Sequence, residues 1–100
     1  MDGFYERAGA RLGGFLAEVG VDHSDYALIV GLTEERLQEI IEARGEQLSV
    51  AELKQICERS MLSADYIFGL QDHPYPFEPT DENFQRLRDK IHKLIDTSKE

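Results

Sequence analysis

The sequence predicts an all-α protein. Apolar residues recur at intervals of three and four positions along most of the chain, which is the spacing of one helix face. Residues that favour helix starts precede these segments, and glycines that favour helix ends follow several of them. No run of alternating apolar and polar residues, and no hairpin turn, offers a competing strand pattern.

The first two helices are expected before residue 31. The first ends before Gly20 and has an apolar face formed by Ala8, Leu12, Phe15, Leu16 and Val19. The second is expected to start at Asp22 or Ser24 and to run to Val30. Gly31 would end it, because glycine tolerates the left-handed conformation that helix ends often adopt.

Three further short helices are expected up to residue 70. Thr33 would cap the third, which stops before Gly45 and turns inward Leu37, Ile40 and Ile41. Ser49 would cap the fourth, whose inward residues are Val50, Leu53, Ile56 and Cys57. The fifth would run from Ser63 through Phe68 and end at Gly69.

The remaining sequence divides into a linker and a C-terminal helix. All three prolines of the chain lie between His73 and Pro79, so residues 71–80 are expected to form an extended, semi-rigid connector. Residues 81–100 are expected to form an amphipathic helix capped by Thr80 or Asp81. The predicted organisation is therefore a body over residues 1–70, a linker over 71–80 and a helix over 81–100.

The composition reduces the number of function classes that suit the chain. Its 100 residues hold 11 Lys and Arg against 20 Asp and Glu, giving a net charge of -9. Such a negative chain is expected to be repelled by nucleic acids and by anionic membranes. The longest apolar run is far shorter than the roughly 20 residues of a membrane span. The absence of a basic leader and the single cysteine, Cys57, fit a cytoplasmic protein.

The most informative spacing is Ala27, then Gly31, then Leu37. Two helices that cross steeply over a short turn need a small residue where their backbones approach. They also need a residue that accepts a positive φ at the turn. Leu37, together with Leu32, would point into the core and fix the crossing angle.

These residues resemble the lambda repressor and Cro-like helix-turn-helix family, also called the XRE family. The resemblance runs from Arg11 to about Leu70 and includes Gly20, the spacing above, and the fourth-helix residues Leu48, Ser49, Val50, Leu53 and Ile56. The segment Ser63-Ala64-Asp65-Tyr66-Ile67-Phe68-Gly69-Leu70 is similar to the final short helix of many members. The resemblance implies a five-helix DNA-binding domain, here with an additional C-terminal helix.

The family resemblance implies sequence-specific binding of an operator in double-stranded DNA by a homodimer that regulates transcription. The positions that match DNA-contacting residues are His23, Ser24, Thr33, Glu34, Glu35, Arg36, Gln38 and Arg44. Arg36 and Gln38 are expected to read bases, and Arg44 to contact a phosphate. His23 departs from the glutamine that many members have there, and Glu34 and Glu35 replace polar or basic residues.

A second hypothesis keeps the fold and replaces DNA with a basic protein partner. Residues 22–44 contain two basic residues, Arg36 and Arg44, against six acidic ones: Asp22, Asp25, Glu34, Glu35, Glu39 and Glu42. A DNA-binding surface needs many cationic contacts to phosphates. The acidic helix pair would then bind a basic protein surface in the manner of an antirepressor.

The C-terminal helix carries a stripe formed by Phe84, Leu87, Ile91, Leu94 and Ile95. An isolated helix of this length is only marginally stable in water, so the stripe is expected to pack against something. Dimerisation with a second copy is the favoured prediction, since DNA-binding relatives use two-fold symmetry. Docking on the body of the same chain is the alternative.

The sequence offers no support for an enzyme. It contains no phosphate-binding glycine loop and no nucleophile motif. Asp22, His23 and Asp25 are close together, but without a second group of ligands they are better explained as helix-start residues than as a metal site. No catalytic residue, metal or cofactor is therefore expected.

Overall fold

The computed structural model describes residues 3–74, 78 and 80–99. Six helices form this part of the chain: α1 Phe4–Val19, α2 His23–Val30, α3 Glu34–Glu42, α4 Val50–Ser60, α5 Ala64–Phe68 and α6 Asp81–Ser98. It contains no strand, which confirms the all-α prediction. Part of the proline-containing linker, residues 75–77 and 79, lies outside the described residues.

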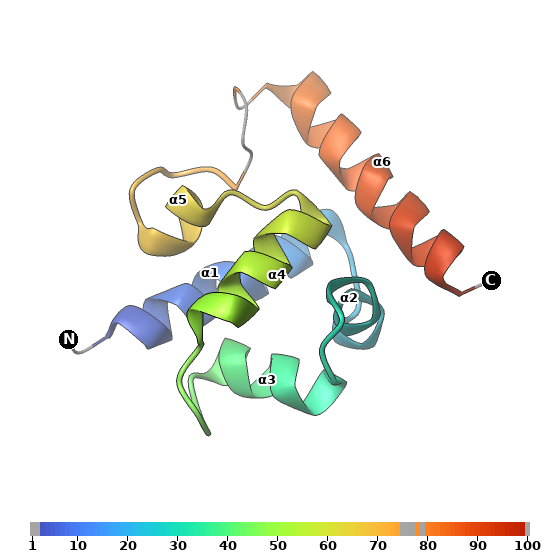
Figure 1. Cartoon of the computed structure of the whole chain (residues 1–100). Helices are drawn as coiled ribbons and strands as arrows, with labels where there is room; N and C mark the ends of the chain where they lie inside the picture. The colour runs from blue at the N-terminus through green and yellow to red at the C-terminus, as the bar shows by residue number, and fades with distance from the viewer. Residues whose placement is uncertain (1–2, 75–77, 79, 100) are drawn as a thin grey trace.

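The core is a single apolar cluster with α1 at its centre. In Figure 1, α1 passes behind α4, while α3, α5 and α6 lie around this central pair. Phe15 and Leu16 of α1, Val30 of α2 and Leu37 of α3 are fully buried in this cluster. Most of the predicted inward residues therefore do form the core. Val50 and Cys57 are exceptions. The prediction that Val50 points inward is wrong, because at the first position of α4 its side chain is 83% exposed, and Cys57 is only half-buried.

The closest approach in the core is between α1 and α3. A Cβ atom on Gly9 would collide with the backbone carbonyl oxygens of Ile40 and Ile41. Only glycine therefore allows the two helix backbones to lie this close. This contact positions α3 directly on the body of the protein.

A buried polar contact connects α2 to α4. Tyr26 is fully buried, and its hydroxyl lies 2.7 Å from the Ser60 hydroxyl. Because Ser60 donates to the carbonyl of Ile56, it accepts the hydrogen bond from Tyr26. Burial raises the pKa of Tyr26 well above its usual range, so it is neutral and packed inside the protein.

Helix α3 ends shortly before Gly45. Its last residue is Glu42, and Ala43 adopts the left-handed conformation with a φ of 55°. Gly45 lies beyond the end of the helix as predicted and also has a positive φ, but Ala43 and Arg44 separate it from the last helical residue. The extra residues lengthen the loop between α3 and α4.

The C-terminal helix packs on the body of the same chain. Leu87, Ile91 and Ile95 are at most 5% exposed and belong to the core cluster. Two polar contacts join α6 to the body: His92 Nε2 donates to the Val19 carbonyl at 3.0 Å, and Lys99 Nζ lies 3.0 Å from Asp25 Oδ1. The prediction that these three apolar residues bind a second copy is wrong, because the chain itself buries them.

The other two residues of the predicted dimer stripe remain partly accessible. Leu94 is 39% exposed, and Phe84 is half-buried against the core. The apolar stripe of α6 is thus divided between a buried row and a partly open edge.

Candidate interaction face of the α2–α3 pair

The α2–α3 pair has the local geometry that its sequence predicts. Gly31 ends α2 with a φ of 76°, and Thr33 caps α3 by accepting a hydrogen bond from the Arg36 amide at 3.0 Å. Ala27 is buried where the helices meet, and Leu37 is buried beneath α3. The turn between the helices is only three residues long, so α3 is presented with one side in the core and the other in solvent.

Arg36, the predicted main base reader, is engaged inside the protein. Its guanidinium donates to both carboxylate oxygens of Glu52, at 2.6 and 2.8 Å, and to Glu39 Oε1 at 3.0 Å. It also donates to the backbone carbonyls of Glu46 and Gln47, at 2.9 and 3.2 Å. The side chain is 17% exposed. Arg36 therefore fastens the α3–α4 loop to the start of α4, and the prediction that it reads bases is wrong.

The charges of this network stabilise one another. Glu52 is the N3 residue of a capping box, in which it and Ser49 bond each other's backbone amides. The hydrogen bond from Arg36, supported by that from the Ser49 amide, lowers the pKa of Glu52 to about 2. In return, Glu52 raises the pKa of Arg36 above its usual range. Both groups are thus ionised at neutral pH and bound to each other.

A second chain of contacts lies on the outer side of α3. His23 Nδ1 donates to Gln38 Oε1 at 2.7 Å, and the Gln38 amide donates to Glu42. This places two predicted DNA-contacting residues, His23 of α2 and Gln38 of α3, in direct contact. The contact joins the start of α2 to the middle of α3 and orients both side chains at the surface.

Arg44 is the other basic residue of this face. Its Nε donates to Glu42 Oε1 at 2.7 Å, and the side chain is 53% exposed. The hydrogen bond from Arg44, with that from Gln38, lowers the pKa of Glu42. An ion pair this open to water contributes little stability. Arg44 is therefore partly neutralised but free to exchange its partner.

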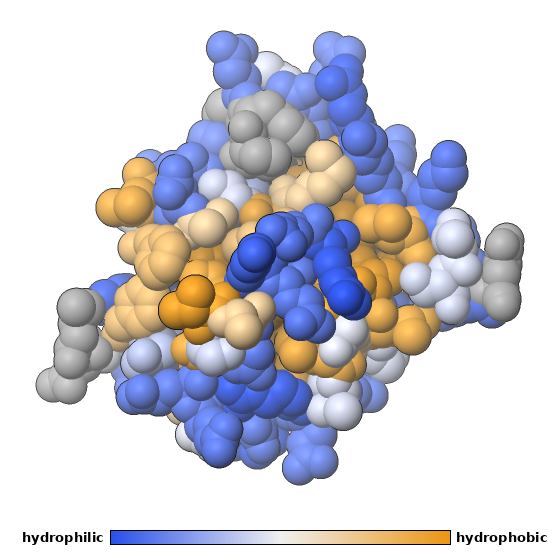
Figure 2. Space-filling model, viewed as in Figure 1, coloured by the Kyte–Doolittle hydropathy of each residue, from blue (hydrophilic) through white to orange (hydrophobic). Residues whose placement is uncertain are grey.

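The rest of the predicted contact set is exposed and consists of two hydroxyl and two acidic residues. Ser24, Thr33, Glu34 and Glu35 are all exposed at the surface. Over residues 22–47 each of the two basic side chains, Arg36 and Arg44, is bonded to a carboxylate. The residues of the α2–α3 face thus present negative charge. The exposed guanidinium of Arg59, from α4, lies beside Gly31 at the turn between α2 and α3. Figure 2 shows the area over α3 as largely hydrophilic.

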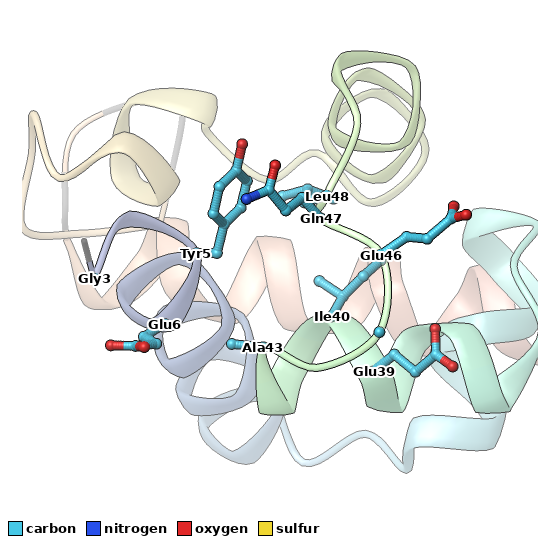
Figure 3. Close-up of a pocket in the computed structure, with 10 residues that line it drawn as sticks. Gly3, Tyr5, Glu6, Glu39, Ile40, Ala43, Glu46, Gln47 and Leu48 are labelled. Atoms are coloured by element: carbon cyan, nitrogen blue, oxygen red, sulfur yellow. The ribbon is translucent and has the colours of Figure 1, made fainter. Parts of the chain in front are cut away.

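A hollow of about 330 Å³ extends this face under the α3–α4 loop. Three acidic residues line it, Glu6, Glu39 and Glu46, together with Tyr5, Ile40 and Leu48. Figure 3 shows Glu39 and Glu46 on one side of the hollow and Tyr5 beside Gln47 and Leu48 on the other. The hollow combines negative charge with an aromatic and aliphatic wall, which suits a positively charged side chain with an apolar stem.

Two residues of the α3–α4 region were missed by sequence reasoning. Glu52 captures Arg36, and Gln55 donates its amide hydrogens to the carbonyls of Val30 and Gly31 at the end of α2. The spacing from Ser49 to Glu52 could have indicated the capping box. No comparable signal in the sequence points to Gln55.

Among the described residues, no group of three His, Cys, Asp or Glu side chains could hold a metal ion. The described helices include none that is long and apolar enough to cross a membrane. Comparison of the chain with known protein families, with curated proteins and with solved structures gives no match.

Proposed function

We propose that this chain is a cytoplasmic regulatory protein with a lambda repressor-like helix-turn-helix fold, whose α2–α3 face binds a basic surface of a protein partner. The fold part of this proposal is supported by the family resemblance and by the short turn between α2 and α3. The observation that carries the binding part is the engagement of Arg36 and Arg44 by carboxylates. A face whose own basic residues are already paired with carboxylates is a poor surface for phosphates and a good one for lysines and arginines.

The number of cationic contacts that DNA binding requires favours a protein partner. A typical DNA-binding protein neutralises several phosphates, and each contact contributes to a steep loss of affinity with salt. Here Glu34 and Glu35 occupy the exposed first turn of α3, where they would face the phosphate backbone. A basic protein surface would instead gain attraction from both carboxylates, mainly through a faster association rate.

Specific DNA binding by a homodimer is the second candidate function, and the exposed outer side of α3 favours it. In that reading the contacts come from His23, Ser24, Thr33, Glu34, Glu35, Gln38 and Arg44, without Arg36. Glutamates can accept hydrogen bonds from cytosine N4, and helix-start amides can bind phosphates without a cation. The open Arg44–Glu42 pair could release Arg44 to a phosphate.

One pair of titrations separates the two candidates. Binding of the full chain to an arginine-rich peptide and to mixed genomic DNA fragments would be followed by fluorescence polarisation at low salt. The protein-binding proposal predicts peptide binding that weakens in the variant carrying Glu34→Lys and Glu35→Lys. Matched single variants separate the site from net charge: Glu35→Lys should weaken peptide binding, whereas Asp89→Lys, which makes the same charge change on α6, should not.

The protein-binding and DNA-binding proposals predict opposite results in these titrations. Saturable binding of a particular DNA fragment by the unaltered chain, with a steep negative dependence on salt, would overturn the protein-binding proposal. Equal weakening of peptide binding by Glu35→Lys and Asp89→Lys would also overturn it, because net charge alone would then explain the affinity. Absence of DNA binding at tens of millimolar salt would remove the DNA candidate.

A further inference from the structure

The partly open edge of α6 forms one wall of a small apolar hollow. Lys90, Lys93, Leu94 and Thr97 share one side of α6 at helical spacing, and Met61 at the end of α4 forms the opposite wall. The hollow has a volume of about 230 Å³. Figure 2 shows apolar surface between the end of α4 and α6, where this hollow lies. A space of this size suits one medium-sized apolar side chain rather than a whole ligand of drug size.

Met61 occupies this position at a conformational cost. It caps α4 in the left-handed conformation with a φ of 59°, which a residue with a Cβ adopts only with strain of about 1–2 kcal/mol. Glycine would end α4 without that strain and would leave no wall. The flexible thioether side chain instead supplies an adaptable apolar surface facing Leu94, which is itself 39% exposed.

The rim of the hollow is positively charged. Lys90 and Lys93 are exposed, and the ion pairs of the described residues involve neither of them. Arg36, Arg44, Arg86 and Lys99 each have a carboxylate partner. In a chain with a net charge of -9, these two neighbouring lysines place positive charge at the rim of the hollow.

We propose that the hollow between α4 and α6 binds an acidic peptide segment that carries one apolar anchor residue. The anchor side chain enters between Met61 and Leu94, and its acidic neighbours pair with Lys90 and Lys93. Apolar anchors in small pockets dominate the affinity of many interfaces, while charges at the rim select the partner and its register. This surface lies on α4 and α6, apart from the acidic α2–α3 face, and its partner has the opposite charge.

The test uses the full chain labelled with ¹⁵N and an acetylated probe peptide with the sequence Glu-Asp-Leu-Glu-Asp. Titration should shift the amide signals of Met61, Lys93, Leu94 and Thr97 in a saturable manner. A peptide with Ala in place of Leu, and one with Gln and Asn in place of the acids, should each bind about threefold to tenfold more weakly.

Matched variants locate the site on one flank of α6. Lys93→Gln should weaken binding of the acidic peptide about threefold, and Leu94→Ala by a similar or larger factor. Arg88→Gln removes the same charge from an exposed position on the opposite flank of α6 and should change binding by less than about twofold. Circular dichroism would verify that each variant retains its helices.

Four results would overturn the inference. The first is the absence of saturable shifts near Met61 and Leu94. The second is equal binding of the Leu and Ala peptides, which would reduce the interaction to charge alone. The third is equal weakening by Lys93→Gln and Arg88→Gln. Saturable binding of octanoate at the hollow without binding of the peptide would replace the peptide by a small carboxylate and would also overturn the proposal.

Discussion

Basic residues on the two sides of α3 have different environments. On the side that meets α1 and α4, Arg36 makes five hydrogen bonds and Gly9 of α1 touches the backbone of α3. On the outer side, Arg44 makes one ion pair that is open to water. The comparison teaches that the number of basic residues near a candidate binding face is a poor guide to its charge. The charge of the face depends on how many of these basic residues are already bonded to carboxylates of the same chain.

The largest expected effect is at the inner side, in Gly9→Ala. The new Cβ would collide with the carbonyl oxygens of Ile40 and Ile41, and backbone atoms cannot move aside as a flexible side chain can. We expect a loss of about 3 kcal/mol in the free energy of unfolding, measured by urea titration.

Gly14→Ala is the matched control for this change, because a Cβ there meets no atom within 4 Å. It lies in the same helix and should stabilise the protein by up to about 1 kcal/mol. If both variants were stabilised, the tight contact between α1 and α3 would be refuted.

The next effect is expected for Arg36→Ala. Its loss leaves Glu52 and Glu39 facing each other across the α3–α4 loop, together with two loop carbonyls that lose their donor. We expect destabilisation of about 2 kcal/mol, because the network is largely shielded from water. A urea midpoint equal to that of the unaltered protein would mean that the loop does not depend on Arg36.

The same network should make stability depend on pH in a defined interval. The pKa of Glu52 falls from 4.5 to about 2 on folding, so its ionised form is favoured in the folded state. The resulting stability is fully present above pH 4.5 and is lost as the pH falls towards 2. Urea midpoints across this interval should fall less steeply in Glu52→Gln. An identical slope in both proteins would contradict the prediction.

The smallest effect is expected on the outer side, in Arg44→Ala. The pair with Glu42 is about half-exposed on both partners, and exposed pairs contribute about 1 kcal/mol or less. We expect the urea midpoint of this variant to match that of the unaltered protein within experimental error. A loss as large as that of Arg36→Ala would erase the distinction between the two sides of α3.

Local sequence signals predicted the helices and the α2–α3 turn because those depend on neighbouring residues. The Thr33 cap, the positive φ of Gly31 and the buried Leu37 all follow from such signals. The role of Arg36 did not, since its partners lie at residues 39, 46, 47 and 52 and come together only in the folded loop.

Helix α6 illustrates a similar limit of prediction from sequence. Its spacing correctly indicated an amphipathic helix whose stripe packs against something. An apolar stripe does not specify its partner, however, because burial against the same chain or against a second copy satisfies the same pattern. The folded structure shows that α6 packs on the body of the same chain, through its contacts with α2 and the hydrogen bond from His92 to Val19.

That hydrogen bond spans 73 positions of the chain, and α6 shares the core with helices formed from its first half. Contacts between such distant positions require closure of a long loop, which slows folding. The other helices mostly pack against helices one or two places away in the chain order, and they are expected to assemble first. During synthesis the surface of α2 that α6 covers would therefore stay uncovered until residues 81–98 emerge, so α6 is the helix that completes this core.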